Sequence, residues 1–163
     1  MNIDKYKNDA LRKAPEHQKY LEKLKHKKPR KLDEKMLEIH NKVFSNIDCL
    51  ECANCCKTTG PLLLEKDIER ISKYLRMKPV DFINQYLYKD EDQDWVFKQL
   101  PCPFLNNSNY CLIYEVRPKA CKEYPHTNRK KFYQINKLTL KNTIICPAAY
   151  EVVELLIKNE RFW

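Results

Sequence analysis

The chain has 163 residues with eight cysteines, nine prolines and a single glycine, and its net charge is +9. This length allows one domain with a modest core, and one glycine excludes the glycine-rich phosphate cradle of P-loop and Rossmann nucleotide-binding enzymes. Because no apolar run approaches the roughly 18 residues that span a bilayer and no signal peptide begins the chain, we expect a cytoplasmic protein without a membrane partner.

The N-terminal part of the chain predicts helix. Residues 4 to 27 carry a sparse apolar stripe at helical spacing, and we expect a break near Ala14 because Pro15 is suited to the first turn of a new helix. A basic linker follows at residues 26 to 31, which is weak evidence for a nucleic-acid or partner contact. We assign residues 1–45 to a basic helical N-terminal arm.

Three further amphipathic helices follow from the apolar spacing. Residues 32 to 47 predict a helix that leads into the cysteine-rich stretch 49–56. The apolar run 62 to 64 then leads into a second helix with Ile68 on its apolar face. Pro79 is placed to open the third.

The middle of the chain predicts a small amount of β structure. Trp95 to Leu100 alternates like a short strand. Residues 102–105 and 110–114, joined by the polar turn 106–109, predict a hairpin with one cysteine on each arm, where opposed strands bring side chains within reach of one metal. The predicted fold class is mainly α with a small β-hairpin (α+β), in a single irregular domain organised around a cysteine-ligated metal centre.

Two later helices each place a cysteine near an N-terminus. Arg117 precedes a short helix that contains Cys121, and Cys146 precedes a helix over 148–158. The positive end of a helix dipole favours thiolate, and Arg117 adds to this effect. A short helix over 132–138 is also predicted between them.

The strongest chemical signal is the cluster of four cysteines between residues 49 and 56. Two consecutive Cys-x2-Cys steps place sulfurs at either end of a tight turn, the separation that one tetrahedral ion or one iron-sulfur cluster requires. Sulfur ligands select zinc or iron over magnesium or calcium. Eight thiols make two four-coordinate sites or one cluster with extra ligands, and in a reducing compartment they indicate metal ligands before disulfides. The candidate metal ligands are Cys49, Cys52, Cys55, Cys56, Cys102, Cys111, Cys121 and Cys146.

Two histidines are secondary candidates. His40 lies in a predicted helix and is better explained as a partly exposed helix residue than as a ligand, because eight thiols are already present. His126 follows the Cys121 segment directly. It is either a ligand, a hydrogen-bond donor to a ligand, or a surface residue.

The ordered motifs resemble a known family. The string C-x2-C-x2-C-C at 49–56, the segment Cys102-Pro103-Phe104-Leu105, the segment 111–125 and Cys146-Pro147 are similar to the CxxCxxCC family of YkgJ-type cysteine-cluster proteins, described as zinc- or iron-chelating domains. The resemblance covers roughly residues 46 to 150, and we assign 46–163 to a cysteine-cluster metal-binding domain. Many members have Gly where this chain has Asn54, and Asn also tolerates a left-handed backbone.

Three classes of function are compatible with these motifs. The first is a non-catalytic module that chelates zinc or iron through cysteine thiolates for storage, sensing or docking of a protein partner. The second is an iron-sulfur or open-zinc enzyme, because one branch of the family resembles flagellin lysine methylase, or a redox protein carrying a 4Fe-4S cluster. The third is a zinc-stabilised nucleic-acid binder, because residues 117–141 hold eight Lys or Arg against one Glu, with aromatic residues interleaved. We assign no catalytic residue and leave open whether the protein is an enzyme.

Overall fold

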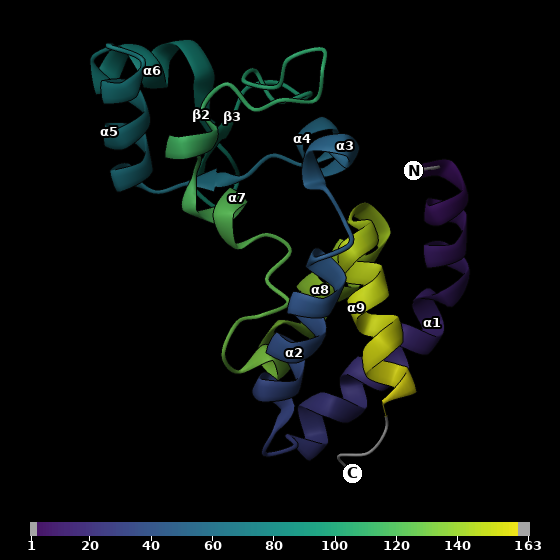
Figure 1. Ribbon diagram of the computed structural model, residues 1–163. Coiled ribbons are helices and arrows are strands. Elements are labelled where there is room, and N and C mark those ends of the chain that lie inside the picture. Colours follow the sequence, from purple (N-terminus) through teal and green to yellow (C-terminus); the bar gives the residue numbers. More distant parts are fainter. Residues whose placement is uncertain (1–2, 160–163) are drawn as a thin grey trace. The chain divides into compact units, whose positions relative to one another are not determined.

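The computed structural model describes residues 3–159, whose elements fall into two compact units, each with its own hydrophobic core (Figure 1). Unit 1 comprises the chain up to Cys49 and from Pro125 onward, and unit 2 comprises Leu50–Tyr124. Helices dominate, and one small antiparallel sheet is present, so the predicted class, mainly α with a little β, is confirmed. Among the described residues, no helix is both long and apolar enough to cross a membrane.

Unit 1 is built from helices contributed by both ends of the chain. They are α1 (Ile3–Lys27), α2 (Leu32–Phe44), the 3-10 helix η2 (Phe132–Ile135), α8 (Asn136–Ile145) and α9 (Pro147–Lys158). α1 packs on α8 and α9, and α2 packs on α9, so their apolar stripes meet in one core. That core contains Tyr20, Leu21, Leu24, Leu32, Met36, Ile39, Val43, Phe132, Ala148, Val152 and Leu156. By packing, α1 therefore belongs with the C-terminal helices, while a functional boundary at residue 45 stays a prediction.

The expected break near Ala14 is wrong, because α1 continues through Pro15. A proline inside a helix removes one backbone hydrogen bond and costs about 3 kcal/mol. Ala10 and His17 lie on either side of Pro15 in α1, and both side chains are fully buried. Packing of α1 against α8 and α9 therefore offsets the local cost.

Unit 2 combines short helices with a three-stranded sheet. Its longer helices are α5 (Glu65–Tyr74) and α6 (Pro79–Tyr86), both expected from the sequence. The strands β1 (Leu62–Leu63), β2 (Leu87–Lys89) and β3 (Trp95–Phe97) pair antiparallel in the order β1-β3-β2. The core of this unit is rich in aromatic rings and consists of Leu63, Ile68, Ile71, Phe82, Leu87, Phe97, Phe104 and Ile113.

The predicted hairpin over 102–114 forms only in part. Its turn is present, because the Asn106 side chain accepts hydrogen bonds from the backbone N–H groups of Ser108 and Tyr110 at 2.9 and 2.8 Å. Its arms, however, share a single β-bridge between Leu105 and Cys111. The sheet forms elsewhere, since the strand expected to start at Trp95 ends at Phe97 and pairs with β1 and β2. β1 lies far from β3 in sequence, so this pairing does not show in a local pattern, whereas β2 and β3 form a hairpin across residues 90–94.

The later helices follow the sequence with one extension. α7 (Lys119–Glu123) and α9 form as expected. The helix predicted over 132–138 begins as η2, and α8 then continues it to Ile145. The extension buries Thr139, Asn142 and Thr143 on a helix with almost no amphipathic pattern, which explains why periodicity underestimates its length.

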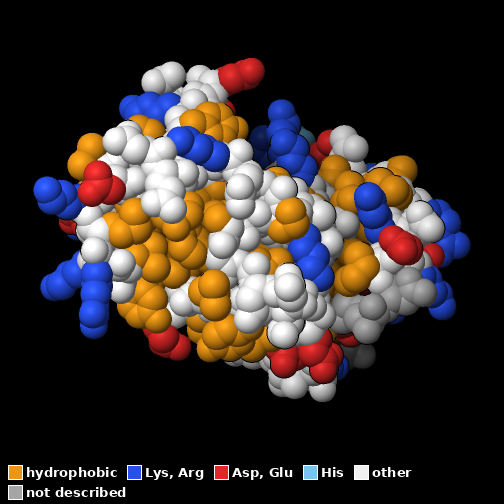
Figure 2. Space-filling model, turned by 90° about the horizontal axis from the view of Figure 1, so that it is seen from above, with side chains coloured by type: hydrophobic (Ala, Val, Ile, Leu, Met, Phe, Trp, Pro, Cys, Tyr) orange, Lys and Arg blue, Asp and Glu red, His pale blue; other side chains and the backbone are white. Residues whose placement is uncertain are grey.

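Apolar side chains also reach the surface, as the orange areas among Lys and Arg in Figure 2 show. Most of the large exposed hydrophobic residues belong to unit 2. They are Leu62, Leu64, Tyr74, Val80, Tyr88, Leu100, Tyr110, Leu112 and Tyr114.

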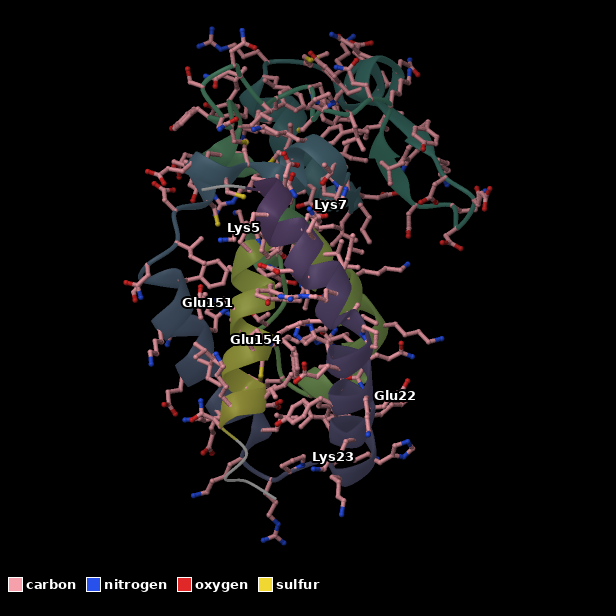
Figure 3. All side chains as sticks on the ribbon, turned by 90° about the vertical axis from the view of Figure 1, so that its right-hand side faces the viewer. Lys5, Lys7, Glu22, Lys23, Glu151 and Glu154 are labelled. Carbon is pink, nitrogen blue, oxygen red and sulfur yellow. The ribbon has the colours of Figure 1, made fainter. Side chains whose placement is uncertain are left out.

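A partly buried hydrogen-bond network around Glu154 joins α1 to α9 inside unit 1. Glu154 accepts hydrogen bonds from His17 Nε2 at 2.8 Å and from Lys13 Nζ at 2.6 Å (Figure 3). Burial acts to raise the pKa of Glu154, but the bonds from His17 and Lys13 outweigh it and hold the pKa below its ordinary value. The network therefore stabilises unit 1 only while Glu154 is ionised.

We predict that Glu154→Gln lowers the free energy of unfolding by about 1–2 kcal/mol at neutral pH, because two charge-assisted hydrogen bonds are weakened. The pKa of Glu154 is lower in the folded chain than in the unfolded chain. Its contribution is therefore present above the unfolded pKa and is lost as the pH falls through the folded value. Urea unfolding at a series of pH values should show parent and variant converging in acid.

Glu151→Gln is the matched control, because Glu151 is exposed on the same helix. Its effect should stay within about 0.5 kcal/mol at every pH. A loss of stability in Glu154→Gln that is equally large in acid would contradict the proposed role of ionised Glu154.

Candidate metal centre

Six of the eight predicted ligands lie in unit 2, on three separate stretches of chain. The first stretch folds as two short helices, α3 (Cys49–Cys52) and α4 (Asn54–Thr58). Ala53 joins them with a left-handed backbone, at φ 46° and ψ 17°. The left-handed residue is therefore Ala53, and Asn54 begins the second helix, in contrast to the expectation from the family pattern. This turn sets the directions in which Cys55 and Cys56 leave α4.

The second stretch carries Cys102 and Cys111. The backbone N–H of Cys102 donates to the carbonyl oxygen of Cys56 at 2.8 Å, which brings this stretch beside α4. Asn109, in the turn between the two cysteines, donates from Nδ2 to the carbonyl oxygen of Glu51 at 3.3 Å. Two hydrogen bonds therefore fasten the loop to the first cysteine stretch.

The third stretch contains Cys121 on α7, and a buried carboxylate holds the start of this helix. Asp67, only 2% exposed, lies in the first turn of α5. It accepts a hydrogen bond from the backbone N–H of Lys119, the first residue of α7, at 3.1 Å. Its other oxygen accepts from the backbone N–H of Leu64 at 3.0 Å, so one side chain ties the start of α5 to the start of α7.

Arg70 completes this anchor. Its Nη2 donates to Asp67 at 2.5 Å and to the carbonyl oxygen of Arg117 at 2.9 Å. Its Nε donates to the carbonyl oxygen of Val116 at 3.3 Å. The pair therefore satisfies backbone groups on both sides of Pro118, the segment that leads into the Cys121 helix.

Sequence analysis misses the roles of Asp67 and Arg70. An acidic residue at the third position of a helix is a known N-terminal capping signal, and it could have identified Asp67 as a cap. No local pattern could have shown that the same carboxylate binds Lys119, more than fifty residues further along the chain.

Of the cysteines with a shifted pKa, Cys56 is the one that ionises most readily. A hydrogen bond with the Cys55 side chain lowers the pKa of Cys56, burial opposes this and nearby Lys57 supports it, with the result that the pKa is about 7. At Cys102, burial raises the pKa to about 11, although the backbone N–H groups of Phe104 and Leu105 donate to the sulfur and act to lower it. Amide donors of this kind stabilise a thiolate once it has formed.

Burial and nearby charges also shift the pKa values of the remaining two thiols, Cys111 and Cys121. Burial raises the pKa of Cys111, and the backbone N–H of Ile113 and the charge of Arg117 act against it. Burial raises the pKa of Cys121 to about 12, and negative charge on the three other thiols raises it further. Arg117 stacks on Tyr114, with its guanidinium carbon 3.8 Å from the ring centroid, and favours thiolate at both cysteines.

These interactions define a thiol cluster within unit 2, made up of Cys56, Cys102, Cys111 and Cys121. Thiolate charge at Cys56 raises the pKa of each of the other three, so all four side chains lie within electrostatic reach of one another. All four are free thiols, as is Cys52 on α3. As the side chains stand, no three Cys, His, Asp or Glu residues in the range 3–159 are positioned to hold a metal ion.

The other predicted ligands are placed differently. Cys49 and Cys146 belong to unit 1. The backbone N–H of Cys146 donates to the carbonyl oxygen of Asn142 at 2.8 Å, and its side chain packs against the unit 1 core. The assignment of these cysteines as metal ligands, like that of Cys52, Cys55 and the four cluster cysteines, stays a prediction.

The two histidines singled out from the sequence both lie in unit 1. His40 Nδ1 is 2.8 Å from Thr127 Oγ1, and its ring stacks on Phe44 with centroids 4.3 Å apart. Burial lowers the pKa of His40. His126 adopts a left-handed backbone with φ 64°, and its role as a ligand stays a prediction.

The donor chemistry of the thiol cluster fits a soft metal. Four sulfur donors match the ligand number of a tetrahedral zinc or iron site and are poor ligands for magnesium or calcium. A bound cation would also neutralise the negative charges of the half-buried thiolates, which repel one another. Arg117 and the amide donors already provide part of that neutralisation.

Comparison with known families gives one match. A family model named CxxCxxCC and described as "Putative zinc- or iron-chelating domain" matches residues 48–140, which is more than half of the chain. No curated protein and no solved structure matches the chain.

We predict that Asp67→Asn lowers the free energy of unfolding by about 2–3 kcal/mol, because it weakens hydrogen bonds to Arg70, Leu64 and Lys119 and leaves a partly buried guanidinium without its counter-charge. The measurement is urea unfolding of the purified chain. Glu69→Gln, an exposed carboxylate on the same helix, is the control and should change the stability by less than about 0.5 kcal/mol. Equal effects of the two substitutions would show that Asp67 is not the anchor of α7.

Proposed function

The chain belongs to the CxxCxxCC family, and from this premise we propose that it chelates zinc or iron through the thiol cluster of unit 2 as a non-catalytic, metal-stabilised module. The observation that carries the proposal is the convergence of Cys56, Cys102, Cys111 and Cys121 from three stretches of chain. Four thiolates would complete the shell of a tetrahedral ion and would leave no position for substrate, which favours a structural or storage role over catalysis.

The residues of the chain divide the work of metal binding. Cys56, with the lowest pKa of the cluster, would supply the first thiolate, and Cys102, Cys111 and Cys121 would supply the others. Binding releases the protons of these thiols, because only thiolates are ligands. Arg117 and the amides of Phe104, Leu105 and Ile113 stabilise the negative charge. A bound divalent ion would supply the remaining positive charge and a cross-link between α4, the 102–111 loop and α7.

The proposal includes a cellular setting and a mode of action. Thiols that serve as ligands require a reducing compartment, so we place the protein in the cytoplasm. A module of this kind acts by storing metal or by shaping a surface for a protein partner. The exposed apolar side chains of unit 2 provide such a surface.

A 4Fe-4S cluster is the alternative centre, and it would draw on Cys49, Cys52 and Cys55 of the first cysteine stretch. Cys-x2-Cys-x2-Cys spacing followed by a distant Cys-Pro is also typical of iron-sulfur ligation, and a redox or enzymatic role would follow from it. The two centres differ in a directly visible property, because zinc is colourless and an iron-sulfur cluster absorbs visible light.

The proposal predicts that protein purified without oxygen contains zinc or iron by elemental analysis. Absorption at about 400 nm would identify an iron-sulfur cluster, and a colourless zinc protein would identify the structural site. Serine substitution of Cys56, Cys102, Cys111 or Cys121 should each lower the metal content severalfold, because serine is a poor ligand for a soft metal. Leu112→Ser, an exposed position next to Cys111, should leave it unchanged. Full metal content in all four serine variants would refute the assigned cluster.

Metal removal provides a second prediction. Structural zinc contributes about 10–16 kcal/mol, as much as the total stability of a domain. Chelation should therefore abolish the dispersed amide NMR signals of residues 50–58 and 102–124. Signals from unit 1 should persist, because unit 1 has a separate hydrophobic core. Unchanged unit 2 signals in metal-free protein would contradict the proposal.

A further inference from the structure

Two basic stretches far apart in sequence come together in unit 1. Residues 25–31 contain five Lys or Arg and His26, and residues 128–137 contain four Lys or Arg; neither stretch contains an acidic residue. Asp33 joins them, because its carboxylate accepts hydrogen bonds from the backbone N–H groups of Lys131 at 2.6 Å and Phe132 at 3.1 Å. The Asp33 carboxylate is thus engaged by the backbone.

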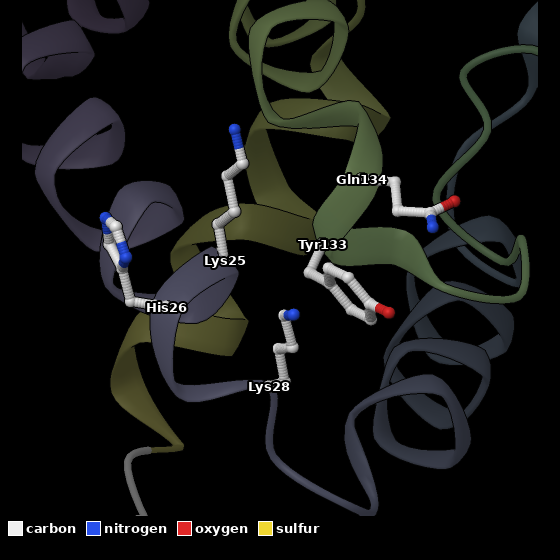
Figure 4. A pocket seen from close by; sticks show the side chains of 5 residues that line it. All are labelled: Lys25, His26, Lys28, Tyr133 and Gln134. Carbon is white, nitrogen blue, oxygen red and sulfur yellow. The ribbon is translucent and has the colours of Figure 1, made fainter.

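A pocket of about 380 Å³ opens between these two stretches. Lys25, His26 and Lys28, at the end of α1, line one side, and Tyr133 and Gln134, from η2, line the other (Figure 4). Lys28 reaches toward the Tyr133 ring, with Nζ 5.6 Å from the ring centroid. The lining therefore combines cationic groups, one half-buried aromatic face and one amide, without a carboxylate.

The backbone on each side of the pocket is held in an unfavourable conformation. Lys28, which follows α1, has φ 45°, and its N–H donates to the carbonyl oxygen of Leu24 at 2.9 Å. Lys131, which precedes η2, has φ 55°. Glycine or asparagine usually takes a left-handed position of this kind. Here both positions are occupied by lysine, which adds a positive charge at each.

We propose that this pocket binds a nucleotide unit, with the phosphate held by Lys25 and Lys28 and the base stacked on Tyr133. Lysines bind phosphate as point charges, and an aromatic ring stacks on any base. The volume suits a ligand of this size. The same chemistry is offered by a free nucleoside monophosphate and by one residue of single-stranded RNA. The neighbouring cations Arg30, Lys130 and Lys131 favour RNA, because a strand places further phosphates within their reach.

This inference is independent of the metal site, because the pocket lies wholly in unit 1. It also narrows the nucleic-acid hypothesis drawn from the sequence. That hypothesis rested on a basic block interleaved with aromatic residues. In the structure, one of these aromatic residues, Tyr133, lines the pocket together with a second basic stretch at the end of α1.

The test uses the metal-loaded full-length chain and fluorescence anisotropy with a labelled single-stranded oligouridylate at low salt. We expect binding that weakens steeply between about 50 and 200 mM salt. Tyr133→Leu should weaken it roughly tenfold through loss of stacking, and Tyr133→Phe should restore it because the ring is kept. Lys28→Gln should weaken binding several-fold and reduce the salt slope by about 0.7, the value for one phosphate contact to a single strand.

Lys7→Gln is the matched control, with the same loss of one positive charge on the helix that Lys28 directly follows. Lys7 lies toward the start of α1, about 27 Å from Lys25 along the helix at 1.5 Å per residue (Figure 3). Equal effects of Lys7→Gln and Lys28→Gln would overturn the proposal, as would no binding of the oligouridylate or of uridine monophosphate at low salt.

Competition distinguishes the two sources of the ligand. If uridine monophosphate displaces the probe at the same nucleotide concentration as an unlabelled oligouridylate does, the ligand is a free nucleotide. Displacement by the oligouridylate alone would indicate single-stranded RNA. Displacement by inorganic phosphate or polyglutamate as efficient as by the oligouridylate would refute the base-stacking site, because charge alone would then explain binding.

Discussion

Four half-buried thiols that oppose one another's ionisation are the constraint around which unit 2 is built. A neutral thiol is tolerated in such a setting, whereas a thiolate pays for desolvation and for the charge of its neighbours. The pKa of Cys121, raised to about 12, shows how strongly burial and crowding act together. Arg117 and the backbone amides directed at the sulfurs lower part of the cost of forming the thiolates. The remaining opposition is the physical reason for our proposal that a cation completes the site.

The four cysteines are held close together by hydrogen bonds more than by regular secondary structure. α4 and α7 each have only five residues, too few to be stable alone. The Cys56 carbonyl holds the Cys102 loop, and the buried Asp67 carboxylate holds the start of α7. Asp67 reaches this segment from α5, a longer helix packed on the aromatic core. The cysteine-bearing stretches are thus fastened to a part of unit 2 that is stabilised by its own hydrophobic packing.

Unit 1 shows a different chemistry. Its core is helical and mostly aliphatic, and Glu154 is paired internally with Lys13 and His17. At the end of α1, in contrast, lysines gather without carboxylates around an aromatic ring. Thiols in unit 2 favour a cation, and this pocket in unit 1 favours an anion, so the two proposals concern opposite charges on separately packed parts of the chain.

The amino-acid sequence by itself determined the family, the mainly helical class, most helices and the preference for a soft metal. These properties follow from local information, namely cysteine spacing, apolar periodicity and the positions of proline. Only the tertiary structure decided which thiols converge, that α1 passes unbroken through Pro15, that Ala53 is left-handed, and that the sheet uses β1, β2 and β3 in place of a full cysteine hairpin. The physical reason is that the thiol cluster, the unbroken α1 and the pairing of β1 with β3 depend on contacts between residues distant in the chain, where burial and hydrogen bonding outweigh local preference.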